Sequence, residues 1–172
     1  TNYLNKDNDS TSLSDNSIND LFLDKEGTLW IATNKGLNKY IRTSNCFQRF
    51  LSGNNQKEAL MINHISIGPD HRMWLGTDKG IRILNSSDNS ISVPTITDDS
   101  LRKFTEGGVS GIYADKNGIT WIGSSIRGGF RCMDSKTYAP LPYPSGFQKD
   151  VLSGYPVNEF YEDKNGVFWF LT

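Results

Sequence analysis

One pattern of apolar and polar residues occurs four times along the chain. Each copy has a short alternating segment, a turn and an apolar run around a tryptophan; in the first three copies a glycine turn and another apolar run follow. The copies begin at Ile18, Ile62, Val109 and Val157. Their tryptophans, Trp30, Trp74, Trp121 and Trp169, are 44, 47 and 48 residues apart. A recurring period of this length is typical of repeat proteins.

The first half of each copy predicts a strand with one buried face, because its apolar residues alternate with polar ones. In copy one these apolar residues are Ile18, Leu21 and Leu23. An Asp-x-x-Gly tetrapeptide then predicts a tight hairpin turn in copies one, three and four, since Asp bonds its own backbone and Gly accepts a positive φ. Copy two has residues 68–71, Gly-Pro-Asp-His, at this point. We therefore expect a different turn type there.

Three further strands are expected in each complete copy. The tryptophan run predicts the second strand, with both faces covered, because its apolar residues are consecutive. Third strands are expected at 37–41, 81–84 and 130–133, and weaker fourth strands at 46–51, at 91–96 and near 138–141.

Four antiparallel strands per copy predict an all-β fold made of propeller blades. A bulky tryptophan packed between successive blades explains why it recurs, so we expect all four tryptophans in the core. A sandwich of stacked hairpins is the alternative. We expect residues 1–17 to form the tail of a preceding blade and a linker. Three full four-stranded blades are expected at 18–51, 62–97 and 109–143, and a truncated fourth blade at 157–172. We expect the chain to be a β-propeller fragment whose open blade faces favour self-association.

Composition excludes several classes of function. The chain has 172 residues and a formal net charge of −1, so it offers no basic footprint for nucleic acid. Its apolar runs are too short to span a membrane. Its first residues do not have the pattern of a signal peptide, but a fragment would lack one in any case. Cys46 and Cys132 lie in different copies, which favours two free thiols over a disulfide.

No catalytic or metal-binding constellation stands out, and no cofactor is expected. His64 and His71 lack further ligands nearby and are interpreted as surface or turn residues. The aspartates before the glycines do not have the spacing of a calcium loop. Serine-hydrolase, zinc-protease and P-loop motifs do not occur.

Ligand contacts are expected instead on the loops at the mouth of a propeller channel. The loops of interest are 34–35, 54–58, 78–79, 125–127 and 145–155. Aromatic rings beside hydrogen-bonding groups suit a sugar, and an arginine can hold a carboxylate bidentately. The candidate residues are Arg127, Tyr143, Phe147, Gln148 and Tyr155. Such a long loop is also simply a place where insertions are tolerated.

The segment DkeGtlWIaTnkGlnkY of copy one resembles the two-component regulator propeller repeat, and SLSDNSI before it resembles the linker between such repeats. Copy two departs from the family pattern at Gly68 and His71, and copy three has two extra residues before Gly129. The resemblance implies a seven-bladed ring in the periplasmic sensor region of a hybrid two-component receptor from Bacteroides-like bacteria. Many members of this family sense oligosaccharides released from glycans, and their histidine kinase lies elsewhere.

This resemblance therefore implies a non-enzymatic sensor module anchored, through the rest of its receptor, to the inner membrane. Its partner would be an oligosaccharide, or a second receptor subunit in a dimer. Two alternatives stay open. One is an enzyme like streptogramin lyase, whose propeller has a similar pattern but uses a catalytic histidine. The other is a propeller that serves only for protein interaction or dimerisation.

Overall fold

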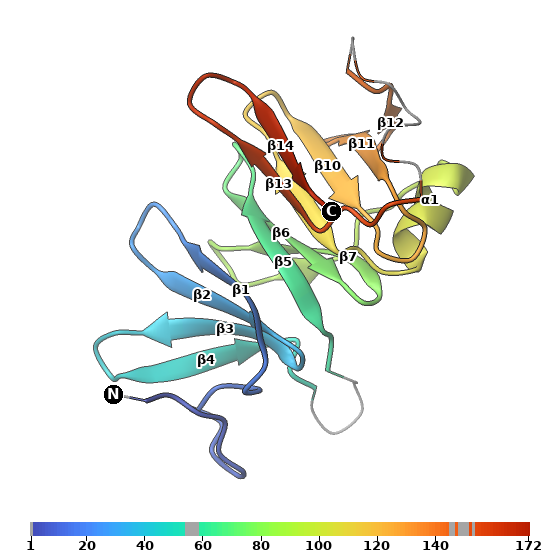
Figure 1. Ribbon diagram of the computed structural model, residues 1–172. Helices are drawn as coiled ribbons and strands as arrows, with labels where there is room; N and C mark the ends of the chain where they lie inside the picture. Colours follow the sequence, from blue (N-terminus) through green and yellow to red (C-terminus); the bar gives the residue numbers. More distant parts are fainter. Residues whose placement is uncertain (1, 54–58, 145–146, 148–151, 153) are drawn as a thin grey trace. The chain divides into compact units, whose positions relative to one another are not determined.

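The computed structural model of the chain describes residues 2–53, 59–144, 147, 152 and 154–172. The chain divides into two compact units, 1–65 and 66–172. Strands dominate both, as Figure 1 shows, and sequence neighbours pair as antiparallel hairpins. The prediction of an all-β chain made of propeller blades is confirmed.

The first unit contains one complete four-stranded sheet. Its strands are β1 (Ile18–Leu23), β2 (Leu29–Thr33), β3 (Gly36–Ile41) and β4 (Cys46–Phe50), and they are hydrogen-bonded in that order. The described residues before β1 contain no strand. Among them, Leu13 packs against Ile31 and Phe47 of the sheet, so this linker forms part of the blade's own core.

Two more four-stranded sheets and a final hairpin follow. The second sheet begins with β5 (Ile62–Ile67), which contains the boundary between the units, and continues through β6 (Arg72–Thr77), β7 (Gly80–Asn85) and β8 (Ile91–Ser92). The third comprises β9 (Gly111–Ala114), β10 (Ile119–Gly123), β11 (Phe130–Asp134) and β12 (Pro140–Leu141). The hairpin pairs β13 (Glu159–Glu162) with β14 (Phe168–Leu171). Among the described residues, helix α1 (Asp99–Glu106) lies between β8 and β9.

The repeated aspartate links the turn of each hairpin to the tryptophan of its second strand. In copy three, one carboxylate oxygen of Asp115 accepts the backbone N–H groups of Asn117 at 2.8 Å and Ile119 at 2.9 Å. The other oxygen accepts the indole N–H of Trp121 at 3.2 Å. Asp24 binds Trp30 in the same way at 2.9 Å. The aspartate therefore satisfies a donor that the core would otherwise leave unpaired.

Copy two keeps the turn but loses this carboxylate. The prediction of a different turn type there is wrong, because His71 takes a φ of +61°, close to the +77° of Gly27 and the +82° of Gly118. Its N–H donates to the carbonyl of Gly68 at 3.0 Å, as the turn glycines do to their aspartates. Histidine can adopt this left-handed conformation, although at some cost. With Gly68 in place of aspartate, the buried indole nitrogen of Trp74 has no hydrogen-bond partner in the described part of the chain.

Three of the four tryptophans lie in the core, and the fourth does not. Trp30, Trp74 and Trp121 are buried, whereas Trp169 is 60% exposed, which corrects the prediction for that residue. Trp121 is covered because Phe168 of the last hairpin stacks on it with ring centroids 4.5 Å apart. Trp169 follows the same local pattern, but no later copy of the repeat lies in this sequence to cover it.

The first strand of copy one is likewise not covered by a neighbouring copy. Its apolar residues Ile18, Leu21 and Leu23 are exposed, so the predicted buried face is absent there. The equivalent residues of copy four, Val157 and Phe160, are buried in a cluster with Trp121 of the preceding blade. Burial at these positions comes from the preceding blade, and no copy precedes Ile18 in this sequence.

Candidate functional site

The turn between the second and third strands differs in the third blade. In the first two blades it has two residues between a threonine and a glycine, and the threonine hydroxyl donates to the glycine carbonyl. These bonds join Thr33 to Gly36 at 2.8 Å and Thr77 to Gly80 at 2.6 Å. In the third blade the turn runs from Ser124 to Gly129, and the Ser124 hydroxyl instead accepts the N–H of Arg127 at 3.1 Å. The two extra residues carry Arg127 out to an exposed position.

Two glycines allow this longer turn to press against a segment farther along the chain. Gly128 and Gly129 have φ values of +66° and +69°, which favour glycine. A Cβ on Gly128 would lie 2.8 Å from the backbone of Gly154. The N–H of Gly129 donates to the carbonyl of Tyr155 at 2.6 Å. The turn is therefore fixed by backbone contacts, and its position does not depend on its exposed side chains.

Helix α1 lies beside this turn and was not predicted from the sequence. The side chain of Asp98 caps it by accepting the N–H of Leu101 at 2.8 Å. Leu101 and Phe104 are buried together with Trp74 and Ile112, so the helix covers the core shared by the second and third blades. These apolar residues are three apart, as one face of a helix requires.

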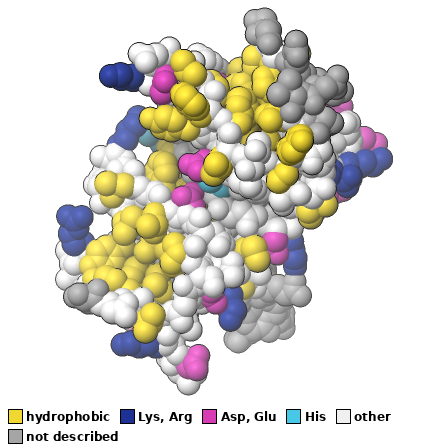
Figure 2. All heavy atoms as spheres, viewed as in Figure 1, with side chains coloured by type: hydrophobic (Ala, Val, Ile, Leu, Met, Phe, Trp, Pro, Cys, Tyr) yellow, Lys and Arg dark blue, Asp and Glu magenta, His cyan; other side chains and the backbone are white. Residues whose placement is uncertain are grey.

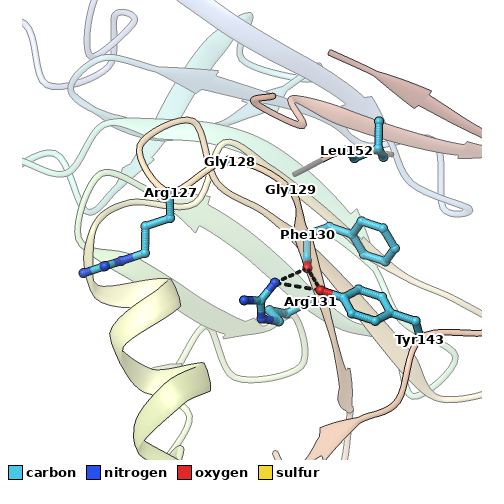
Figure 3. Close-up of a pocket in the computed structure, with 7 residues that line it drawn as sticks. All are labelled: Arg127, Gly128, Gly129, Phe130, Arg131, Tyr143 and Leu152. Atoms are coloured by element: carbon cyan, nitrogen blue, oxygen red, sulfur yellow. Dashed lines mark hydrogen bonds between the residues drawn. The ribbon is translucent and has the colours of Figure 1, made fainter. Parts of the chain in front are cut away.

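A small pocket opens between the turn and the strand that follows it (Figure 3). Its volume is about 90 Å³. The lining residues are Arg127, Gly128, Gly129, Phe130, Arg131, Tyr143 and Leu152. In Figure 3, Arg131 and Tyr143 point toward each other, while Arg127 extends away from them.

Hydrogen bonds hold the polar groups of this pocket in place. Nη1 of Arg131 donates to the hydroxyl oxygen of Tyr143 at 2.7 Å and to the carbonyl of Phe130 at 2.9 Å. The Tyr143 hydroxyl donates to the same carbonyl at 2.9 Å. Because this hydroxyl already donates within the protein, Tyr143 can offer a ligand an oxygen lone pair and the part of its ring that does not pack against Phe130 and Phe147.

The other predicted contact residues lie in different surroundings. Phe147 packs against Phe130, with ring centroids 4.8 Å apart, and against Phe170 at 5.6 Å, so its ring belongs to the aromatic cluster between the third sheet and the final hairpin. Tyr155 is 62% exposed. Gln148 and the loop 54–58 lie outside the described residues. The structure thus brings Arg127 and Tyr143 to one pocket, and whether any of these residues binds a ligand stays a prediction.

Sequence reasoning missed the residues that complete this region. Arg131 lies on β11 at the position that Arg82 has on β7, so its charge did not stand out from the repeat. The helix could have been found from Asp98 followed by an apolar spacing of three, but eight residues give a weak periodic signal.

The remaining reactive side chains form no site in the described residues. The His64 side chain is only 16% exposed, so it is more buried than predicted, and its Nδ1 lies 3.9 Å from Oδ2 of Asp20. His71 is exposed on its turn. No cluster of three or more His, Cys, Asp or Glu residues suited to a metal occurs in the ranges described. Both cysteines are free, and burial raises the pKa of the Cys132 thiol to about 12.

Comparison with known families identifies the repeat. Residues 12–35 match the family model described as "Two component regulator propeller". This segment is similar to a two-component regulator propeller repeat. The matched residues include the linker, the turn aspartate and Trp30 of the first blade, which are the features that carried the resemblance. No curated protein sequence matches the chain.

Solved structures support the propeller fold. The chain is similar to the extracellular domain of the putative hybrid two-component system BT3049 from B. thetaiotaomicron, with 19% identity and a TM-score of 0.70 over 100% of this chain and 21% of that one. It is also similar to the extracellular domain of the putative one-component system BT4673 from B. thetaiotaomicron, with 20% identity and a TM-score of 0.67 over 91% and 22%. The WD40 repeats of RRP9 match with 14% identity and a TM-score of 0.56 over 84% and 41%.

The chain spans about a fifth of the length of the two extracellular domains that it resembles. At these identities the likeness concerns the fold. Among the described residues, no helix has the length and apolar character needed to cross a membrane.

Proposed function

We propose that the chain is a non-catalytic part of the periplasmic sensor region of a hybrid two-component receptor, and that this receptor responds to oligosaccharides derived from glycans. The observation that carries the proposal is the match of residues 12–35 to the two-component regulator propeller family. The likeness of the fold to extracellular domains of putative hybrid two-component systems supports the same receptor class. Binding of the oligosaccharide would bias the geometry of a receptor dimer and thereby its kinase.

Features of the third blade support a ligand-binding role for this part of the receptor. Its second turn is longer than those of the first two blades and carries the exposed Arg127. The adjoining pocket combines an aromatic ring, Tyr143, with the guanidinium of Arg131. At about 90 Å³ the pocket is smaller than the ~300–1,000 Å³ of typical small-molecule sites, so it would receive one group of a larger ligand.

Two measurements test the proposal. The coding sequence on both sides of the chain should contain further copies of the repeat, a membrane helix and a histidine kinase. If it instead encodes a single secreted ring without a kinase, the receptor assignment is contradicted and the enzyme or scaffold alternative is favoured. Thermal unfolding with a panel of neutral and acidic oligosaccharides tests sensing. A ligand at 100 times its Kd should stabilise the protein by about 2.7 kcal/mol. A panel without any stabilising member would count against oligosaccharide sensing.

We also propose that the exposed blade faces bind a second copy of this chain. Figure 2 shows hydrophobic side chains gathered over β13 and β14, where Tyr161, Trp169 and Leu171 are exposed. Within the chain, the face of Trp121 is covered by Val157 and Phe160, which begin the next copy. Leu21 of β1 is exposed at the position equivalent to Phe160. The β14 face of one copy therefore matches the β1 face of another in chemistry and spacing.

Such pairing is heterologous, because it joins two different surfaces of the same chain. A variant altered on one surface should therefore still pair with a variant altered on the other. Leu21→Lys should block one face and Trp169→Lys the other. In sedimentation velocity we expect concentration-dependent oligomers of the unaltered chain, monomers of each variant alone, and dimers when the two variants are mixed. An unaltered chain that stays monomeric at about 100 times the concentration of the binding assays, or mixed variants that stay monomeric, would contradict this pairing.

A further inference from the structure

A second pocket lies on the side of Arg127 and Arg131 that faces helix α1. Its volume is about 270 Å³, and its lining is Ser100, Lys103, Phe104, Arg127 and Arg131. We call it the cationic pocket. The helix supplies three of its residues, the long turn supplies Arg127 and strand β11 supplies Arg131. Four of the five lie outside the repeat pattern, since the helix and the longer turn occur only beside the third blade. The fifth, Arg131, has the position on β11 that Arg82 has on β7.

The two arginines of the cationic pocket are held in place by different contacts. Arg131 lies over the ring of Phe104, with its guanidinium carbon 4.7 Å from the ring centroid, and Nη1 binds Tyr143 and a backbone carbonyl. A Cβ on Gly107 would lie 3.7 Å from Nε of Arg127, so that side chain reaches the C-terminal end of α1. The partial negative charge of a helix C-terminus favours this placement. In Figure 3 the two side chains extend toward α1 from the turn and from the strand.

The positive charges of the cationic pocket have no acidic partner among the described residues. The carboxylates of α1 are engaged elsewhere. Asp98 caps the helix, while Asp99 and Glu106 bind Arg102 at 2.7 and 2.6 Å. Lys103, Arg127 and Arg131 form no ion pair within the described part of the chain. Because like charges repel one another, three cations around one pocket favour an anion between them.

Donor geometry defines the kind of anion. Of the Arg131 donors, only Nη1 binds within the described structure, and the guanidinium of Arg127 donates to none of the described residues. A guanidinium fork matches the two oxygens of a carboxylate or of a sulfate. The pocket volume is just below the range of typical ligand sites, so it would receive one charged sugar unit.

We propose that the cationic pocket binds the carboxylate or sulfate group of an acidic oligosaccharide. This inference rests on the proposed sensor function and adds the charge of its ligand. Lys103 contributes a point charge, Arg127 and Arg131 contribute hydrogen bonds, and Phe104 supports the Arg131 guanidinium with its ring.

Titration calorimetry at low salt with three sugars of matched size tests the inference. The probes are digalacturonate, which carries carboxylates, sulfated galactobiose, and neutral galactobiose. We expect at least one acidic probe to bind more tightly than the neutral one. Arg127→Gln should weaken that binding by about 10- to 100-fold, which is the range for a hydrogen bond to a charged group. Lys103→Gln should weaken it less and should reduce its dependence on salt.

Arg42→Gln provides the matched control. Arg42 is exposed on the turn between β3 and β4, so the change removes the same charge outside the cationic pocket. Binding of the acidic probe should be unchanged in this variant. The probe that Arg127→Gln weakens, digalacturonate or the sulfated sugar, identifies the anionic group.

The possible negative results lead to different conclusions. If neutral oligosaccharides bind and neither acidic probe binds more tightly, the inference is wrong and the sensor proposal stands. Equal weakening by Arg127→Gln and Arg42→Gln would show that net charge attracts the acid without this pocket, which also overturns the inference. If no oligosaccharide of either kind binds, both the inference and the sensing proposal fail.

Discussion

Replacing Asp115 should destabilise the chain more than any other change to the repeated turns. Its side chain is 2% exposed. One oxygen binds the N–H groups of Asn117 and Ile119, and the other binds the indole N–H of Trp121. In Asp115→Ala the indole is left without its partner in the core, which costs about 1–3 kcal/mol.

The two backbone groups contribute a smaller part of the effect. Asn117 is exposed and Ile119 is half-buried, so water can replace part of their lost bonds. Together with the indole, we expect a total loss of about 2–4 kcal/mol for Asp115→Ala, since contributions of one network do not simply add. Asp115→Asn keeps an acceptor but turns an N–H₂ group toward at least one donor. It should lose about 1–2 kcal/mol.

Urea unfolding followed by tryptophan fluorescence measures both losses by linear extrapolation. Asp163→Ala is the matched control, because Asp163 forms the same turn in the last hairpin and Trp169 there is exposed. Its loss should be clearly smaller than that of Asp115→Ala. Equal losses for the two variants would show that the carboxylate acts through the turn alone, and the assigned role of the buried indole bond would be refuted.

Three further results follow from burial and close packing. Trp74→Ala and Trp121→Ala should each lower the free energy of unfolding by roughly 3–5 kcal/mol, whereas Trp169→Ala should change it by less than about 0.5 kcal/mol in the monomer; denaturant titration measures all three. Gly123→Ala should detach the final hairpin, because its Cβ would clash with the carbonyl oxygen of Val157, and faster proteolysis after residue 156 would report it; unchanged cleavage would contradict the close approach. Cys132 should be alkylated far more slowly than Cys46 at pH 8, because its thiol is buried and has a pKa raised to about 12, whereas alkylation requires the thiolate. Equal alkylation rates of the two cysteines, measured by mass spectrometry, would contradict the burial of Cys132.

Local sequence was sufficient to predict the strands of the four copies and the aspartate turns of copies one, three and four, although the turn type expected in copy two was wrong. Each turn is formed within one hairpin by the aspartate, by the glycine that is the fourth residue of the Asp-x-x-Gly tetrapeptide, and by the tryptophan. The conformation of this turn therefore does not depend on distant contacts. Even His71 follows the local rule, because the turn needs a residue that accepts a positive φ and does not need a glycine as such.

Burial could not be predicted from the same pattern. Trp121 and Trp169 have the same local surroundings, yet Phe168 covers the first and no part of this sequence covers the second. The same holds for Leu21 and Phe160. In a repeat protein each unit depends on its neighbours to bury its faces. Which apolar residues form the core therefore depends on the neighbouring copies as well as on the copy itself.

The candidate site was predictable only in part for a related reason. Arg127 could be found because the extra residues of its turn interrupt a regular repeat. Lys103, Phe104 and Arg131 became part of the site through the packing of α1 against the third blade, and no repeat position indicates that packing.

Three departures from the repeat lie close to one another beside the third blade, and this placement supports the proposed function. The helix, the longer turn and the segment at 154–156 are all absent from the first two blades, and they contact one another around Gly128 and Gly107. Stability alone does not require them, because a two-residue turn held by a threonine closes the equivalent strands of the other blades. Exposed loops carry binding residues more often than the scaffold that positions them. The helix and the longer turn both line the cationic pocket, and this placement supports the proposal that the third blade binds the ligand.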